Sequence, residues 1–238
     1  MSLYNYAVRI EETLKSVHTQ TLSALELIVV DDASSDGSSA VVLAWLERHS
    51  QRFARTLLLQ HEVNSGLAAA RNTAFAAAEA SWCFVLDADN QLKPEAVAQC
   101  LAVAQHAPAT AAVVHPLVAL AYEQPDAYRR TLLSHQSWQR ECFQSGNYVD
   151  AMALVRRSAW QQVGGYTHIP GGWEDFDFWC SLIDAGLHGV LCPQLLAVYN
   201  VHDTSMAATC TRRLERPLSR LLMQRHPWLR LPLAAEAL

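Results

Sequence analysis

The sequence has little charge and no long basic segment. Charged residues make up 17% of the 238 positions, and the formal net charge is −5. Lysine and arginine gather only in one short group near the end of the chain, Arg212, Arg213, Arg216 and Arg220. Because electrostatic capture of nucleic acid needs a basic patch or stripe, nucleic acid is a poor candidate partner. We expect the arginine group to form a solvated helix face, with peripheral contact to anionic membrane lipid as the alternative.

No apolar run is long enough to cross a bilayer, for which about 20 residues are needed. The longest candidate, residues 111–122, is interrupted by His115 and Pro116. The first residues have neither the basic flank nor the apolar core of a signal peptide. These absences predict a cytoplasmic protein with no transmembrane segment, with peripheral membrane association as an alternative.

Several motifs that would identify other classes of protein are missing. The six cysteines include no C-x-x-C pair and most lie in apolar runs, which predicts buried free thiols rather than a zinc site or a disulfide framework. The sequence has no G-x-G-x-x-G, no G-x-x-x-x-G-K-[ST] and no G-x-S-x-G. These absences argue against a dinucleotide oxidoreductase, a P-loop NTPase and an α/β-hydrolase.

What the sequence does contain is a core-forming composition, with 51% hydrophobic residues, and an alternation of two patterns. Short apolar runs predict strands at residues 25–30, 56–60 and 82–86, and segments of helical periodicity lie between them. This order predicts an α/β fold with a parallel sheet covered on both faces. No linker or repeat is present, so we expect one domain at residues 1–206 and a helical tail at residues 207–238.

The alternation begins at the turn before the first helix. Because a doubly wound sheet usually starts with a central strand, we expect that first strand to be absent from this chain. An upstream segment or a strand swapped from a second copy would then fill the position, which makes a homo-oligomer one expectation. We also expect nucleotide binding by this chain alone to be weak.

Two of the expected strands end in paired acids, Asp31 with Asp32 and Asp87 with Asp89. Ligands of a parallel sheet bind outside the carboxyl ends of its strands, so these acids predict a site there. Two carboxylates on one strand-end loop suit a divalent ion together with a diphosphate or a ribose. His202, just past a later apolar run, is a candidate metal ligand, and a hydrogen-bonded surface histidine is the common alternative.

A helix expected at residues 174–185 carries a third group of acids. Its periodicity places Glu174 and Asp177 on the solvated face and Asp175 at the border of the apolar stripe. The positive end of the helix favours an ionised Asp175, which then accepts a proton from a bound hydroxyl. The alternative, more common on local grounds, is that the acids only complement the helix dipole.

Arg71 lies among alanines in another expected helix. This is an unusual place for a solvated arginine. Recognition of a phosphate or a base is one interpretation, and a side chain that extends over the core to reach solvent is the other.

Six segments, taken in this order, resemble the family-two glycosyltransferases. The resemblance covers about residues 4–206. The segments are Tyr4-Asn5-Tyr6, Glu26 to Ser38 with Asp31-Asp32, Asn64-Ser65-Gly66 to Asn72 with Arg71, Phe84 to Asn90 with Asp87-Ala88-Asp89, Gly164-Gly165-Tyr166 with the later Glu174-Asp175, and Tyr199-Asn200-Val201-His202.

The resemblance implies a GT-A fold, which is a Rossmann-like, mostly parallel sheet flanked by helices. It also implies a nucleotide-sugar donor, most often a UDP-sugar, a Mn²⁺ or Mg²⁺ ion, and inversion at the anomeric carbon. The acceptor would be a hydroxyl of a carbohydrate or glycoconjugate, as in polysaccharide synthesis.

On the donor side, the resemblance assigns Tyr4 and Asp32 to the base. Arg71 matches the family's arginine near the base and phosphates, and Asp87 would contact the ribose.

For the metal and the chemistry, the resemblance assigns four further residues. Asp89 would bind the ion that bridges the diphosphate, and His202 matches a histidine that reaches the metal or pyrophosphate. Asp175 matches the general base of the Glu-Asp motif, with Glu174 as the fallback.

Two alternatives belong to other classes. A non-catalytic glycosyltransferase-like domain for carbohydrate binding or assembly has no need of acids at all these points. A sugar-phosphate nucleotidyltransferase needs a Gly-rich basic loop after its first strand, and none is visible. In the region expected to choose the acceptor, Trp138, Tyr148 and Trp173 either stack on sugar rings or pack in the core.

Overall fold

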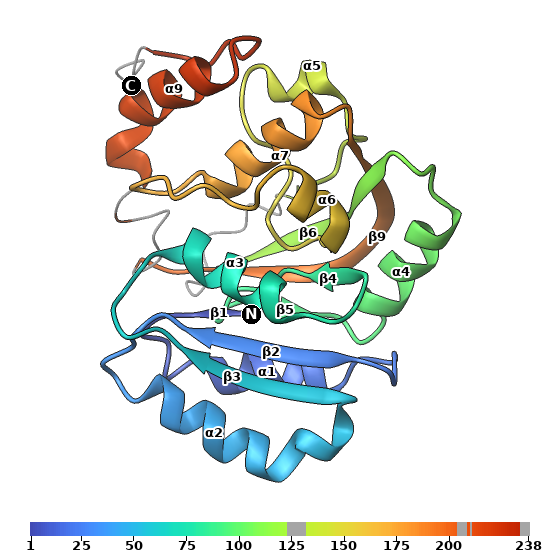
Figure 1. Cartoon of the computed structure of the whole chain (residues 1–238), viewed down its shortest axis with the longest axis vertical. Coiled ribbons are helices and arrows are strands. Elements are labelled where there is room, and N and C mark those ends of the chain that lie inside the picture. The colour runs from blue at the N-terminus through green and yellow to red at the C-terminus, as the bar shows by residue number, and fades with distance from the viewer. Residues whose placement is uncertain (123–131, 204–208, 210, 234–238) are drawn as a thin grey trace.

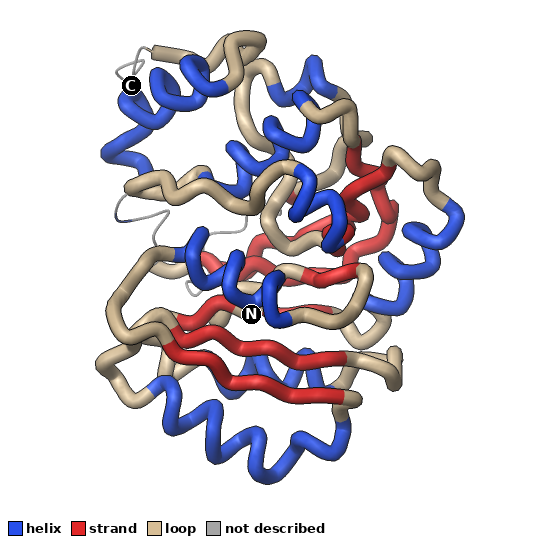
Figure 2. Tube along the Cα trace, in the orientation of Figure 1, coloured by secondary structure: helices blue, strands red, loops and turns tan. Residues whose placement is uncertain are grey.

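The structure, a computed structural model, describes residues 1–122, 132–203, 209 and 211–233 (Figure 1). Figure 2 shows the helices and strands along the chain. The helices are α1 (Ile10–His18), α2 (Ser38–His49), α3 (Leu67–Ala77), α4 (Ala96–His106), α5 (Arg140–Phe143), α6 (Arg157–Gln162), α7 (Glu174–Asp184) and α9 (Glu215–Arg225), with 3-10 turns η1 (Ser50–Arg52) and η2 (Thr211–Leu214). The strands are β1 (Ser2–Leu3), β2 (Glu26–Asp31), β3 (Arg55–Gln60), β4 (Trp82–Phe84), β5 (Gln91–Leu92), β6 (Ala111–Tyr122), β7 (Leu132–Leu133), β8 (Leu154–Arg156) and β9 (His188–Val201).

The first half of the chain builds a parallel sheet in the order β1-β2-β3. Strand β2 is apolar on both faces. Leu27 and Val29 pack in the cluster that includes α1 and α2, and Ile28 and Val30 pack against α3. In Figure 1, α3 lies in front of this sheet and α1 behind it. Burial of both faces explains the uninterrupted apolar run and confirms the helix-covered parallel arrangement predicted for this half.

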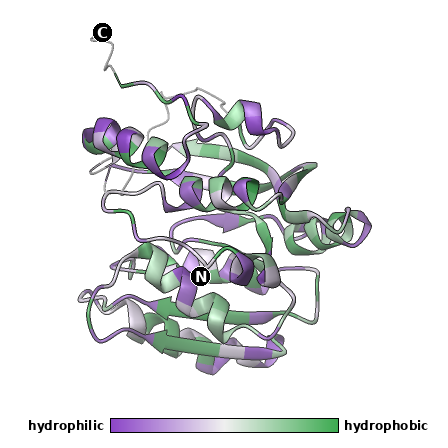
Figure 3. Cartoon of the chain, turned by 45° about the horizontal axis from the view of Figure 1, so that its top comes forward, coloured by the Kyte–Doolittle hydropathy of each residue, from purple (hydrophilic) through white to green (hydrophobic). Residues whose placement is uncertain are grey.

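The second sheet is mixed, in the order β4-β8-β6-β9-β5, with β7 paired to β6. Within the described residues, β6 and β9 run parallel, and the other pairs of this sheet are antiparallel. The expectation of a mostly parallel sheet is therefore wrong for this half. An apolar run indicates that a strand is buried, but it does not indicate the direction of that strand. A buried strand in an antiparallel pair has the same apolar pattern as one in a parallel sheet. Figure 3 shows hydrophobic residues along these strands.

Strand β1 lies where we expected no strand. Ser2 pairs with Val30 of β2 and also forms a parallel bridge to Asp87. Ser2 therefore connects the first sheet to the segment that follows β4 of the second sheet. Ahead of β1, the sheets enclose a cavity of about 330 Å³. Its walls include Val17, Leu25, Ile28, Ala74, Phe75, Trp82, Phe84 and Leu154. The Met1 amine lies at this cavity and donates a hydrogen bond to the carbonyl of Ile28 at 2.8 Å, and burial lowers its pKa to about 6.

Helix α9 packs on the main body. Leu218 and Leu222 belong to the same apolar cluster as Phe176 and Trp179 of α7. The expected boundary between residues 206 and 207 lies outside the described residues. No described helix has the length and apolar character that a membrane crossing requires.

The cysteines with described positions are free thiols. Cys100, Cys180 and Cys192 are buried, as expected, whereas Cys83 and Cys142 are partly exposed. Cys210 lies outside the described residues.

Candidate active site

The loop after β2 is organised by its two acids. Asp31 accepts hydrogen bonds from the backbone and side chain of Ser34. Asp32 is buried and accepts backbone hydrogen bonds from Ser65 at 2.9 Å and Gly66 at 2.7 Å, and Nδ1 of His61 lies 2.6 Å from it. The carboxylate of Asp32 thus fixes the loop that precedes α3 at the carboxyl end of the sheet.

The segment before α1 lies against this loop. Asn5 has a positive φ of 58° and its side chain accepts a hydrogen bond from the backbone of Ser35 at 2.8 Å. Tyr4 is 46% exposed, so its ring faces solvent next to this turn. An exposed aromatic ring beside a hydrogen-bonded loop is available to stack on a planar ligand.

Arg71 of α3 is held between two acids. Its guanidinium donates to Glu174 at 2.7 Å and to both carboxylate oxygens of Asp87 at 3.0 and 3.1 Å. The side chain is 3% exposed, and its charged end lies over the ring of Tyr166. Burial opposes the charge, but Asp87 and Glu174 outweigh it, so the pKa of Arg71 is raised. Arg71 therefore links α3, the end of β4 and α7 rather than extending into solvent.

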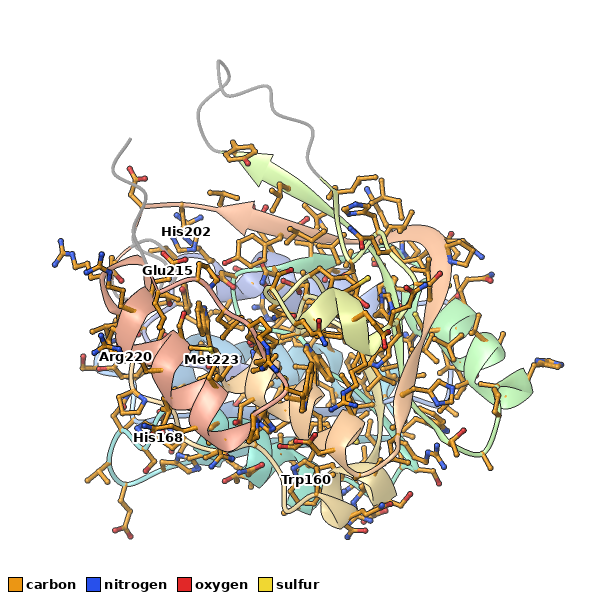
Figure 4. All side chains as sticks on the ribbon, turned by 90° about the horizontal axis from the view of Figure 1, so that it is seen from above. Trp160, His168, His202, Glu215, Arg220 and Met223 are labelled. Carbon is orange, nitrogen blue, oxygen red and sulfur yellow. The ribbon has the colours of Figure 1, made fainter. Side chains whose placement is uncertain are left out.

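Asp89, between β4 and β5, lies next to His202, which directly follows β9. Oδ2 of Asp89 lies 3.0 Å from Nε2 of His202, and the Tyr6 hydroxyl also bonds to Asp89. The side chain of Asn200 donates to the Asp89 carbonyl at 2.6 Å. Burial, and then the charge of Asp87, raise the pKa of Asp89. His202 is labelled in Figure 4, just past the end of β9.

Asp89 and His202 fit a divalent ion that also binds the phosphates of a substrate. Burial, and then the charge of Asp87, disfavour the ionised form of Asp89, and a cation would offset both effects. Among the described residues, no group of three or more His, Cys, Asp or Glu side chains is arranged to hold a metal alone. Mg²⁺-type sites commonly use one or two protein ligands and complete the shell with water and substrate phosphates.

Asp175 is the second residue of α7, two positions after Trp173, whose φ is 68°. Its Oδ1 accepts the Phe176 amide at 2.8 Å, and its Oδ2 accepts the side-chain amide of Asn147 at 3.0 Å. Burial, and then the charge of Glu174, raise the pKa of Asp175 to about 7. A carboxyl that titrates near neutral pH is suited to general acid–base work.

Two of the acids on α7 lie where the periodicity did not place them. Glu174 and Asp177 are 5% and 1% exposed, so the prediction of a solvated face is wrong for both. Each has a distant cationic partner, Arg71 for Glu174, and Arg225 with His226 for Asp177. Buried charges of this kind are retained where they are paired.

Sequence reasoning missed Tyr6, Asn147 and Asp150. Tyr6 is adjacent to the Tyr4-Asn5 turn, which is the one signal that pointed towards it. Asn147 and Asp150 come from the irregular segment between α5 and β8, where no periodicity marks them. Burial raises the pKa of Asp150 to about 6, and its charge acts on Asp175.

The three aromatic residues considered for sugar stacking pack against the core. Trp138 lies 4.7 Å from Phe143, Tyr148 lies 4.5 Å from the same ring, and Trp173 lies 6.0 Å from Phe176, measured between ring centroids. The alternative of core packing describes all of them.

Residues 1–164 match a family model described as "Glycosyl transferase family 2". The chain belongs to this family. The model covers Tyr4, Asp32, Arg71, Asp87 and Asp89, and its last residue is Gly164.

Relatives in sequence carry glycosyltransferase and polysaccharide names. An uncharacterized glycosyltransferase of Haemophilus influenzae is 26% identical over 182 residues, which are 76% of this chain and 59% of that protein. The O-antigen biosynthesis protein RfbC of Myxococcus xanthus is 28% identical over 181 residues, 74% of this chain and 13% of that protein. This family 2 chain therefore spans less than two thirds of these relatives.

Solved structures share the fold. The mannosyltransferase PcManGT of Pyrobaculum calidifontis, in complex with GDP-Man and Mn²⁺, has a TM-score of 0.66 and 24% identity over 87% of this chain and 57% of its own. TarS of S. aureus, in complex with UDP-GlcNAc, has a TM-score of 0.68 and 16% identity over 93% of this chain and 65% of its own. At these identities, the likeness shows an α/β fold of GT-A type.

Proposed function

We propose that this family 2 chain transfers a sugar, with inversion, from a nucleoside diphosphate sugar to an acceptor hydroxyl. UDP-sugars are the first donors to test, and polysaccharide or glycoconjugate synthesis is the proposed setting. The observation that carries the proposal is that two groups of acids lie on different elements. Asp87 and Asp89 follow β4, whereas Asp175 lies on α7 and has a pKa raised to about 7.

The strand-end loops provide the donor side. We assign Tyr4 and Asp32 to the base and Asp87 to the ribose. Tyr4 is exposed, and the side chain of Asp87 is 25% exposed, so both are accessible to a ligand. Arg71 holds Asp87 in place at 3.0 Å, and we assign it to the neighbourhood of the base and phosphates.

Asp89 and His202 are the residues that would hold Mn²⁺ or Mg²⁺. Bound there, the ion would supply charge stabilisation for the departing diphosphate, worth several kcal/mol in general. The hydrogen bonds of Tyr6 and His202 to Asp89 orient its carboxylate.

Asp175 acts as the general base. The acceptor oxygen forms a bond to the anomeric carbon while the bond from that carbon to the diphosphate oxygen breaks, and the hydroxyl proton moves to Asp175. Glu174 is committed to Arg71 at 2.7 Å, so Asp175 is the freer of the two acids. A positioned base typically contributes about 10²- to 10⁴-fold in rate.

Calorimetric titration with UDP and GDP in the presence of Mn²⁺ tests the donor site. We expect binding that requires the metal and is lost in Asp89→Ala, with Glu95→Ala, an exposed acid elsewhere, as the control. Asp175→Asn should bind as the wild type does but lose turnover of UDP-GlcNAc and GDP-mannose. Because we expect this chain alone to bind weakly, the titration is repeated with a version extended before Met1. Absence of binding of UDP and GDP by both versions, with Mn²⁺ and with Mg²⁺, would favour the non-catalytic domain instead.

A further inference from the structure

Asn147 is clamped in one orientation next to Asp175. Its Oδ1 accepts the backbone amide of Val149 at 3.1 Å, and its Nδ2 donates to Oδ2 of Asp175 at 3.0 Å. A side-chain amide can be reversed at little cost where nothing distinguishes its two ends. Here the Val149 amide requires an oxygen, so the nitrogen must face Asp175.

The carboxylate of Asp175 is thereby held at both oxygens. Oδ1 accepts the amide of Phe176 at 2.8 Å, and Oδ2 accepts Asn147. Two hydrogen bonds to different oxygens fix the plane of the carboxylate. Each oxygen can accept a further hydrogen bond, so one lone pair on each oxygen remains for an incoming hydroxyl.

We propose that Asn147 is a positioning residue that orients Asp175 to accept the proton of the acceptor hydroxyl. This inference rests on the proposed function, in which Asp175 is the general base. Asn147 reaches Asp175 from the segment between α5 and β8, so that segment takes part in the reaction through this one hydrogen bond. A base held within a narrow angular range reacts faster than one that rotates freely.

The electrostatic surroundings give the contact a second effect. Burial, and then Glu174 and Asp150, disfavour the ionised form of Asp175, whereas Arg71 and the Phe176 amide favour it. Donation from Asn147 also favours the ionised form, because hydrogen bonding to a carboxylate stabilises its charge. Loss of this donor should therefore move the titration of Asp175 to higher pH.

The variant Asn147→Asp separates this role from a structural one. It keeps an oxygen to accept the Val149 amide and nearly the same shape, but it removes the NH₂ donor and adds a negative charge. Asn147→Ala removes the donor without adding charge. Gln144→Glu is the matched control. Gln144 is an exposed residue of the same segment, and this substitution adds one negative charge without changing the hydrogen bond of Asn147 to Asp175.

Carbon-13 NMR of protein labelled at the aspartate carboxyls follows the titration of Asp175 directly, with Asp175→Asn to assign the signal. We expect the midpoint to rise by about one pH unit in Asn147→Asp, by less in Asn147→Ala, and not at all in Gln144→Glu. An unchanged midpoint in both Asn147 variants would overturn the proposal, whether or not a donor is turned over.

Release of nucleoside diphosphate from UDP-GlcNAc and GDP-mannose with Mn²⁺ gives the functional readout. In Asn147→Asp, kcat at neutral pH should fall about tenfold or more, with the donor KM nearly unchanged and part of the loss recovered at higher pH. If Asp175→Asn keeps its activity, the assignment of the base fails. If Asp175→Asn is inactive and Asn147→Asp behaves as the wild type, only the role of Asn147 fails.

Discussion

Arg71 and Glu174, 103 residues apart in sequence, form a buried ion pair with 2.7 Å between Nη1 and Oε1. The same guanidinium holds Asp87, which lies just past β4. One cation therefore fixes the distance between the proposed donor side and the helix that carries Asp175. Loss of the Arg71 guanidinium should lower the free energy of unfolding and change the geometry of both acid groups.

Replacement of Arg71 by Met should be strongly destabilising. Breaking a buried pair typically costs about 3–5 kcal/mol, because the partner is left charged and buried. Urea unfolding followed by circular dichroism measures the loss. Arg48→Met is the control, since its pair with Glu11 is more than half exposed at both ends and such pairs contribute about 1 kcal/mol or less. Equal losses in the two variants would contradict the structural role given to Arg71.

Asp175→Asn should make the protein more stable while it abolishes turnover. The pKa of Asp175 is raised in the folded chain, to about 7, so ionisation costs folding free energy once the pH exceeds the ordinary carboxyl value of 3.8. The gain in melting temperature should be absent at low pH, grow up to about pH 7 and then level off. A gain of about 3 °C or more at pH 8 is expected. Glu174→Gln should lose stability instead, because it leaves Arg71 with one fewer partner.

A cluster at the C-terminal end of α9 should give stability its own pH dependence. His226 lies 3.0 Å from Asp177 and 2.6 Å from Asp184. Burial lowers the pKa of His226, but these two acids more than offset it and the net direction is upward. Burial likewise opposes ionisation of Asp177, yet His226 and Arg225 hold its pKa below the ordinary value.

The two directions fix the pH window. The contribution of His226 is complete below its ordinary pKa of 6.5 and is lost as the pH rises through its raised value. The contribution of Asp177 is complete above its ordinary pKa and is lost as the pH falls through its lowered value. Thermal melts of the wild type and His226→Asn should therefore differ most at mildly acidic pH and converge under alkaline conditions. His106→Asn, at an exposed histidine, should follow the wild type throughout.

Tyr6→Phe should weaken the metal site without removing a proposed ligand. The Tyr6 hydroxyl bonds to Asp89, and loss of such an orienting group typically lowers metal affinity about 10- to 100-fold. Titration of Mn²⁺ in the presence of UDP measures the change. Tyr148→Phe is the control, because the Tyr148 hydroxyl donates to the Ser137 carbonyl and accepts the Gln139 amide, with no bond to Asp89 among those of the described residues. Equal affinities in Tyr6→Phe and the wild type would show that Asp89 needs no support from Tyr6.

Local patterns were sufficient for β2 and β3 of the parallel sheet, but not for β1. Strand β2 was predicted because a strand that is buried on both faces has apolar residues at consecutive positions, and the acids that follow it could be read directly from the sequence. The direction of β8 against β4 and β6 was not, since antiparallel pairing depends on how distant segments meet.

The acid groups of the candidate site could be predicted, but their partners could not. The resemblance assigned Asp89 and His202 to one metal site, and the structure places Oδ2 of Asp89 3.0 Å from Nε2 of His202. Their binding of a metal stays a prediction. Asn147 has no local signature, and its role depends on a residue 28 positions away. The burial of Asp177 depends on Arg225 and His226, which periodicity within α7 does not reveal.

The cavity ahead of β1 bears on how the protein can be handled. The Met1 amine is already hydrogen-bonded inside it, between walls formed by both sheets. A polypeptide that precedes Met1, whether a natural segment or a purification tag, would therefore begin in this cavity, next to its apolar walls. An apolar linker at that end should be tolerated better than a charged one, because a charge there would be buried without a partner.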